Sequence, residues 1–144
     1  MLKEFRYPVE LTQDGDQVIA RVIDVPEALT FGDDREHALH EAEDALVVAL
    51  SGYIDSRKPI PVPARSGIRQ PAVVLTPLVA AKVALYNAML ESKTSNVALA
   101  KKLGVTETVI RRLLNLDHRS HIGQIEQALE LLGLRLITSV ADVA

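Results

Sequence analysis

The polar residues with the most informative spacing lie between Lys101 and Arg119. Arg111, Arg112 and Asn115 fall within five residues of one another, so a single helix could present them to a groove of DNA. An arginine can form two hydrogen bonds with the edge of a guanine, and an asparagine can form two with an adenine. Lysines and arginines beside such a helix neutralise phosphates without reading sequence. The predicted DNA-contacting set is Lys101, Lys102, Thr106, Glu107, Thr108, Arg111, Arg112, Asn115 and Arg119.

The segment from Asn96 to Asn115 has the residue types that a helix-turn-helix needs in order to position that set. Ala100 is small where the second helix passes close to the first, and Gly104 allows the positive φ of a sharp turn. Leu103, Val105, Ile110 and Leu113 are expected to fill the angle between the two helices. The second helix of this motif enters the major groove with its N-terminus first. The alternative is a helical hairpin with a solvated basic face, which the joint spacing disfavours.

DNA readers of this kind commonly act as pairs. One recognition helix covers few base pairs, and a two-fold operator repeats its half-site about 34–36 Å away. We therefore expect a homodimer or a higher oligomer, with Arg135–Val140 as one candidate for the dimer surface. The same segment alternates like a strand, and pairing with Ala72–Leu75 would add a small sheet beside the C-terminal helices.

The first sixty residues follow a different pattern. Short alternating segments, Phe5–Leu11 and Gln17–Ile23, flank an Asp-Gly pair at position 14 that suits a tight hairpin turn. A helix is predicted from about Arg35 to Ser56, and Asp33 with Glu36 has the spacing of a capping box at its start. The sequence thus predicts a β-hairpin and small sheet followed by one amphipathic helix.

A Pro-rich stretch separates this part from the helical half. Five of the seven prolines lie at positions 59, 61, 63, 71 and 77, and such chain is extended and semi-rigid. We predict an α+β protein with an acidic N-terminal domain over residues 1–64, a Pro-rich linker over 65–77, and an all-α domain of the Cro/C1-like helix-turn-helix type over 78–144.

The two halves carry opposite charge. Residues 1–70 hold 8 Lys or Arg against 13 Asp or Glu, whereas residues 71–144 hold 8 against 6. An acidic surface favours a basic partner, and a local basic patch favours nucleic acid. The chain has no cysteine, which excludes disulfides and thiolate chemistry. Its N-terminus lacks a secretory pattern, and its most apolar stretch is broken by Pro77, Lys82 and Asn87, so we expect a cytoplasmic protein with no membrane contact.

Catalytic and metal sites are alternative roles for the acidic and histidine residues. Asp24, Asp33, Asp34 and Asp44 could be imagined as a two-metal nuclease site, but helix capping and solvation account for their positions. The histidine pairs at 37 and 40 and at 118 and 121 have the spacing of two metal ligands, yet neither pair has a third ligand beside it. We therefore expect no enzyme activity, no metal and no cofactor.

Two stretches together resemble the HicB family of antitoxins. One runs from the hairpin at Asp14-Gly15-Asp16 through Asp24-Val-Pro-Glu-Ala-Leu-Thr-Phe-Gly-Asp-Asp-Arg-Glu-His-Ala into the helix that follows. The other combines Lys82-Val-Ala-Leu-Tyr86, Leu99-Ala-Lys-Lys-Leu-Gly104, Ile110-Arg-Arg-Leu113 and Gln127-Ala-Leu-Glu-Leu-Leu-Gly133, and is similar to the helix-turn-helix branch of that family. The sequence departs from many relatives at Glu27-Ala28, where a glycine with a small polar residue is common, which affects the expected shape of the third strand.

The resemblance implies a partial ribonuclease-H-like N-terminal fold without nuclease activity. It also implies that this domain masks a HicA-like toxin, a small basic ribonuclease that cleaves mRNA, while the C-terminal domain binds the operator of its own operon. The acidic charge of the first half agrees with such a partner. The alternative is a one-component transcriptional repressor whose N-terminal domain senses a small ligand. A neighbouring reading frame for a small basic protein would favour the antitoxin.

Overall fold

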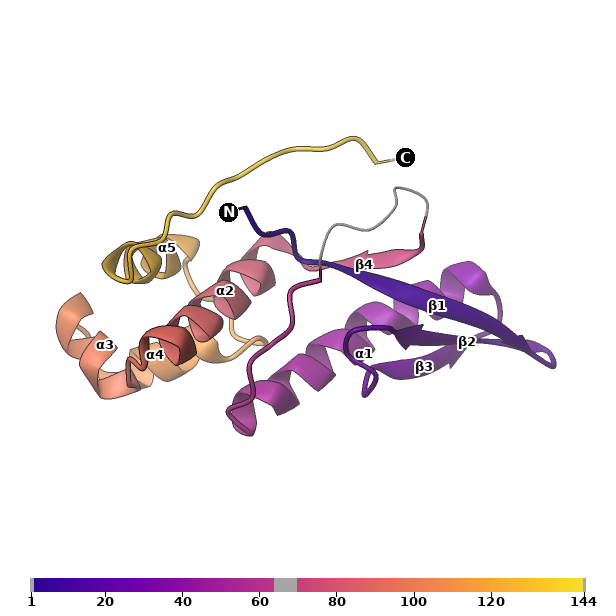
Figure 1. Ribbon diagram of the computed structural model, residues 1–144, viewed down its shortest axis with the longest axis horizontal. Coiled ribbons are helices and arrows are strands. Elements are labelled where there is room, and N and C mark those ends of the chain that lie inside the picture. Colours follow the sequence, from indigo (N-terminus) through magenta and orange to yellow (C-terminus); the bar gives the residue numbers. More distant parts are fainter. Residues whose placement is uncertain (1, 64–69, 144) are drawn as a thin grey trace. The chain divides into compact units, whose positions relative to one another are not determined.

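The computed structural model describes residues 2–63 and 70–143, which divide into two compact units, Met1–Ala80 and Ala81–Ala144. The first unit contains a four-stranded sheet and one long helix, and the second is helical (Figure 1). The chain is therefore of the α+β class, as predicted. Residues 64–69, which include the predicted boundary at 64 and the start of the predicted linker, lie outside the described residues.

The sheet of the first unit is antiparallel throughout and has the strand order β3-β2-β1-β4. Its strands are β1 (Arg6–Asp14), β2 (Gln17–Val22), β3 (Leu29–Gly32) and β4 (Ala72–Val74). The hairpin between β1 and β2 turns at Gly15, whose φ of 59° only glycine adopts easily. This confirms the turn predicted from the Asp-Gly pair.

Helix α1 (Arg35–Asp55) lies along one face of this sheet (Figure 1). Ala38, Ala42, Leu46 and Leu50 recur at helical spacing and are buried, and they form the core together with inward-facing residues of the strands such as Val9, Val18, Ala20 and Val22. Apolar residues at this period stabilise the helix mainly by being removed from water.

The cap of α1 is Asp34, and the prediction of Asp33 for that role was wrong. The side chain of Asp34 accepts a hydrogen bond of 2.7 Å from the His37 amide, which satisfies one of the free N–H groups at the helix start. The Asp33 amide instead donates to His37 Nδ1 over 3.0 Å. One residue of offset is enough to exchange the roles of two adjacent aspartates.

The described parts of the Pro-rich stretch pack against the strands of the first unit. Tyr7 is fully buried, and its hydroxyl donates to the Pro61 carbonyl over 2.8 Å. After the segment that is not described, β4 pairs with β1, with Tyr7 opposite Val73. The expected pairing of Ala72–Leu75 with Arg135–Val140 was therefore wrong, and residues 134–143 contain no strand. Part of the predicted linker, 72–74, is an edge strand of the N-terminal sheet.

The second unit consists of α2 (Pro77–Ser92, which begins at the end of the first unit), α3 (Asn96–Leu103), α4 (Glu107–Leu114) and α5 (Ile122–Leu131). Each helix contributes at least one large apolar residue that is completely buried. In the order α2 to α5, these include Leu85, Leu99, Ile110 and Ile125. Shortly after the end of α5 comes Gly133, which has a φ of 81°, the left-handed conformation that commonly ends a helix.

Candidate nucleic-acid interface and exposed sheet face

Helices α3 and α4 are joined by the three residues 104–106. Helix α3 begins after Ser95, whose hydroxyl accepts from the Ala98 amide over 3.0 Å. It ends at Gly104, which has a φ of 71°. The amides of Gly104 and Val105 bond back to the carbonyls of Lys101 and Ala100, which is the hydrogen-bond pattern of a Schellman motif. The turn predicted at Gly104 is confirmed.

The residues predicted to pack between α3 and α4 differ in how deeply they are buried. Ala100 is buried, as are Ile110 and Leu113, whereas Leu103 and Val105 are half-buried. Thr106 occupies the N-cap position of α4, where a threonine commonly caps, but its side chain makes no capping hydrogen bond. Its hydroxyl therefore does not serve the end of the helix.

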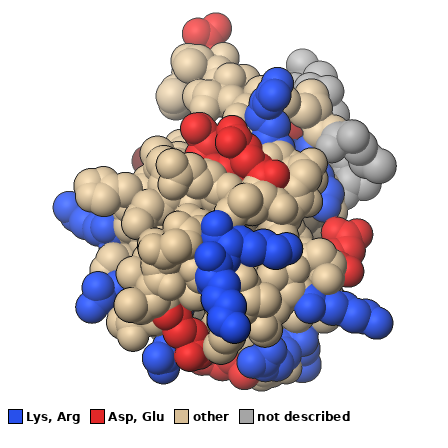
Figure 2. Space-filling view, turned by 90° about the vertical axis from the view of Figure 1, so that its left-hand side faces the viewer, with Lys and Arg blue, Asp and Glu red and all other residues tan. Residues whose placement is uncertain are grey.

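Every residue of the predicted DNA-contacting set is exposed. Arg111 and Arg112 lie in the last turn of α4, on the opposite side from buried Ile110 and Leu113. The remaining members, also exposed, are Lys101, Lys102, Thr106, Glu107, Thr108, Asn115 and Arg119. Figure 2 views the protein from the end at which Figure 1 shows α3, and there Lys and Arg side chains are spread over the surface with Asp and Glu between them.

Asn115 follows the last helical residue of α4 and has extended backbone angles. Its side-chain oxygen accepts from the Asp117 amide over 3.0 Å, which folds the chain into a short turn. An asparagine that reads adenine uses both its oxygen and its amide. To make that contact, the side chain of Asn115 would have to break its hydrogen bond with the Asp117 amide.

Lys82, on α2, is the functional candidate that sequence reasoning missed. The residue is fully buried, and its ammonium donates to the Arg112 carbonyl, the Asn115 carbonyl and Ser120 Oγ, each over 2.8 Å. Burial lowers the pKa of Lys82 to about 8 from its ordinary 10.5. The signal in the sequence was a lone lysine within an otherwise apolar helix.

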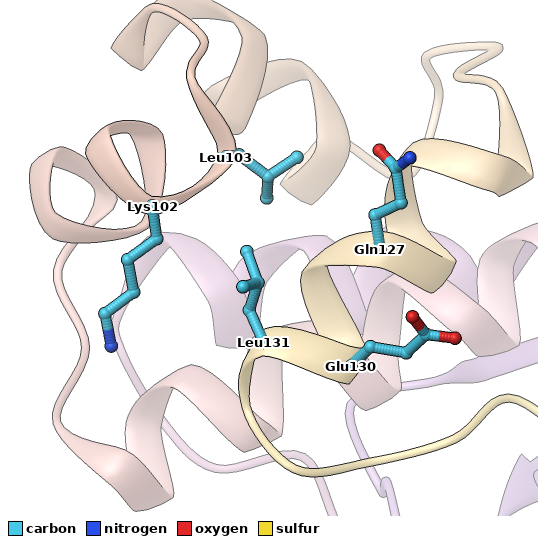
Figure 3. A pocket seen from close by; sticks show the side chains of 5 residues that line it. All are labelled: Lys102, Leu103, Gln127, Glu130 and Leu131. Atoms are coloured by element: carbon cyan, nitrogen blue, oxygen red, sulfur yellow. The ribbon is translucent and has the colours of Figure 1, made fainter.

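An open hollow lies between α3 and α5 (Figure 3). It is lined by Leu103 and Leu131 with Lys102, Gln127 and Glu130 at its sides. Leu131 remains 45% exposed, so the hollow is shallow and open to water. An enclosed ligand site would have a deeper apolar lining, so we interpret this hollow as a surface depression.

Some of the candidate carboxylates and histidines interact with near neighbours in the chain. Over residues 2–63 and 70–143, no three His, Asp or Glu side chains gather in a way that could hold a metal ion. His37 Nδ1 accepts from the Asp33 amide, and its Nε2 lies 3.4 Å from Glu41 Oε1. His118 Nδ1 lies 2.9 Å from Ser120 Oγ.

The sheet face opposite α1 carries exposed apolar side chains beside charged ones. The registers place Phe31 opposite Ile19 and Leu29 opposite Arg21, on the side of the sheet away from the buried Val18, Ala20 and Val22. Phe31 and Leu29 are 57% and 58% exposed. Arg21 pairs with Glu10 on the neighbouring strand over 3.3 Å. We call the residues Glu10, Ile19, Arg21, Leu29 and Phe31 the outer sheet face.

Among the described residues, no helix combines the length and the apolar character that a membrane crossing requires.

Comparison with known proteins places the chain in a family. The family model described as "HicB_like antitoxin of bacterial toxin-antitoxin system" matches residues 6–84. Antitoxin HicB 2 of Photorhabdus laumondii is 43% identical over 136 residues, which cover 94% of this chain and 96% of the relative. Antitoxin HicB of Pseudomonas fluorescens is 39% identical over 137 residues, 94% of each chain. Antitoxin HicB of Escherichia coli K12 is 35% identical over 133 residues, 91% of this chain and 96% of the relative. The chain therefore belongs to the HicB family of antitoxins of bacterial toxin–antitoxin systems.

Proposed function

We propose that this antitoxin neutralises a small basic HicA-like ribonuclease with its N-terminal unit and represses its own operon by binding the operator through α3 and α4. The observation that carries the DNA half is the exposure of Arg111 and Arg112 on a short helix whose opposite side is buried. Both activities need only binding. They belong in the cytoplasm, where operator DNA and mRNA are accessible.

The arrangement of α3, Gly104 and α4 supports reading of the major groove as a helix-turn-helix. The buried residues Ala100, Ile110 and Leu113 hold the two helices together and leave the polar side of α4 outward. Arg111 and Arg112 are placed to contact base edges, and Lys101, Lys102 and Arg119 to contact phosphates. The first pair would set sequence preference, and the other three would set salt dependence.

We propose the outer sheet face as the surface that contacts the toxin. Exposed aromatic and aliphatic side chains at the centre of a patch, with charges around them, are typical of protein interfaces. Acidic residues at or just beyond the ends of these strands, Asp14, Asp16 and Asp24, are exposed. Their charge would attract a cationic ribonuclease and orient it during encounter.

A homodimer is proposed for operator binding, because one α4 covers too few base pairs for useful selectivity. The segment Arg135–Val140 is a candidate for the dimer surface. Ile137 and Val140 are 62% and 97% exposed, although both are strongly apolar. Removal of the chain after Gly133 should shift the mass measured by light scattering to that of a monomer. An unchanged mass would assign the dimer surface elsewhere.

The DNA half is tested by Arg111→Ala and Arg112→Ala, with Arg35→Ala as a control that removes the same charge from α1. Each test variant should weaken binding to the operator fragment by roughly 5- to 150-fold, the discrimination that one good base contact carries. Neutralisation of the purified toxin should not change. Equal loss of both activities would contradict the division of labour between the two units.

The toxin half is tested by Phe31→Ala in the full chain. The control is Val48→Ala, which removes apolar surface from α1 at a residue that is 71% exposed. Because both side chains are largely in water, neither change should alter stability by more than about 0.5 kcal/mol. Phe31→Ala should weaken toxin binding by at least about tenfold in calorimetry. A larger effect of Val48→Ala would move the interface to α1.

A further inference from the structure

The C-terminal end of α4 is held by a cation from another helix. An α-helix leaves its last four carbonyl oxygens without partners inside the helix, and its C-terminus carries partial negative charge. In α4 the carbonyl of Arg112 belongs to this group. It accepts from the Asn115 amide over 3.2 Å just past the helix end, and in addition from Lys82 Nζ over 2.8 Å and from Ser120 Oγ over 3.3 Å. The positive charge of Lys82 therefore lies where the dipole of α4 favours it.

The same ammonium also fixes the chain that leaves α4. Its second bond goes to the Asn115 carbonyl, and its third goes to Ser120 Oγ. These acceptors lie five residues apart on either side of the exposed residues Asp117, His118 and Arg119. All three protons of the ammonium are thus used, and each acceptor is an uncharged oxygen. A lysine in this position joins α2, the end of α4 and the following loop at a single point.

From this geometry we propose that Lys82 is a positioning residue for DNA recognition: it fixes the direction of Arg112, Asn115 and Arg119 without touching DNA. This inference rests on the proposed operator binding. A base contact depends on bond directions, because two hydrogen bonds to one base edge must form together. A change of about an ångström at the end of α4 would therefore impair base reading more than phosphate contact, which tolerates movement of long side chains.

The variant Lys82→Met keeps an unbranched side chain of similar length but removes all three donors. Operator binding should fall by roughly 10- to 100-fold, the discrimination of about one bidentate base contact. Binding to a scrambled duplex of equal length should change by less than about threefold, because Lys101 and Lys102 are unaffected. The ratio of the two affinities is the readout, since loss of folded protein would lower both equally.

Leu85→Ala is the matched control. Leu85 lies one turn further along α2 and is fully buried, so its truncation destabilises the same unit by about 2–5 kcal/mol without removing a hydrogen bond. At temperatures where each variant is folded, Leu85→Ala should keep the wild-type ratio. If the ratio of operator to scrambled-duplex affinity falls equally in both variants, Lys82 acts only through stability and the proposal is overturned.

A second variant covers the case in which Lys82→Met does not fold. Ser120→Ala removes one of the three acceptors, so it should lower the operator-to-scrambled ratio in the same direction but by less than Lys82→Met, roughly two- to tenfold, because two bonds of the ammonium remain. In two-dimensional NMR its amide shifts should be confined to residues 112–120. An unchanged ratio would overturn the role of Lys82, whereas failure of the wild type to prefer the operator would overturn the proposed DNA binding itself.

Discussion

Gly32→Ala should destabilise the N-terminal unit, because the added methyl group has no room between β3 and α1. Gly32 ends β3, and a Cβ at this position would overlap the Ala38 amide nitrogen and lie 2.7 Å from both Ala38 Cα and the His37 carbonyl carbon. Ordinary van der Waals contact begins near 3.4 Å. Because all three neighbours are backbone atoms of α1, no side-chain rotation can relieve the overlap, so strand and helix must separate by roughly 1 Å.

The magnitude follows from what that separation disturbs. Overpacking of a core costs about 1–3 kcal/mol. The displaced first turn of α1 also contains the bond from the His37 amide to Asp34, a cap worth about 1 kcal/mol. Alanine loses less conformational entropy than glycine on folding, which stabilises the variant by about 0.5–1 kcal/mol. We expect a net loss of about 2 kcal/mol in the free energy of unfolding, or roughly 8–16 °C in Tm for a unit of this size.

Scanning calorimetry of the full chain measures this change, because the two units can unfold in separate transitions. Gly52→Ala is the control: it makes the same chemical change within α1, where a Cβ meets nothing within 4 Å. Its better helix propensity should raise stability by about 0.5–1 kcal/mol. If Gly32→Ala melts with the wild type, or if both variants shift alike, the close contact between β3 and α1 is not as described.

Two further predictions concern charged residues in unusual settings. Arg57 and Lys93 have φ values of 56° and 53° at the ends of α1 and α2, so glycine at either position should raise the free energy of urea unfolding by about 0.5–1 kcal/mol, and a loss would contradict the left-handed assignment. Because burial lowers the pKa of Lys82 to about 8 from 10.5, the unfolded state binds more protons between these values, and this residue should make unfolding harder as pH rises through that window. The measurement is the difference in free energy of unfolding between wild type and Lys82→Met as a function of pH. Taking this difference removes the contribution of Tyr7, whose pKa is raised by burial and which lowers stability above about pH 10 in both proteins. A difference that does not change with pH would refute the prediction.

Features that depend on neighbouring residues could be predicted from the sequence. The turn at Gly104 and the end of α5 near Gly133 follow from the need for positive φ, which few residue types meet. The long period of alanines and leucines in α1 likewise fixes its buried side. These assignments require no knowledge of the rest of the fold.

Features that depend on distant contacts could not be predicted in this way. A three-residue strand such as β4 has almost no periodicity, and its partner β1 lies more than fifty residues earlier. In the sequence Lys82 only interrupts an apolar stretch, because lysine is rarely buried and nothing local reveals the distant carbonyls that accept its protons. The first residue of α1 was predicted correctly as Arg35, but the capping-box spacing of Asp33 from Glu36 pointed to the wrong aspartate.

The place of β4 in the chain has a consequence for biosynthesis. The ribosome makes β1, β2, β3 and α1 first, but the edge of β1 stays unpaired until residues 72–74 emerge, about fifty residues after β2 is complete. At ordinary rates of translation this delay is roughly 3–10 seconds. Throughout it, a nascent antitoxin exposes a strand edge that can pair with other chains.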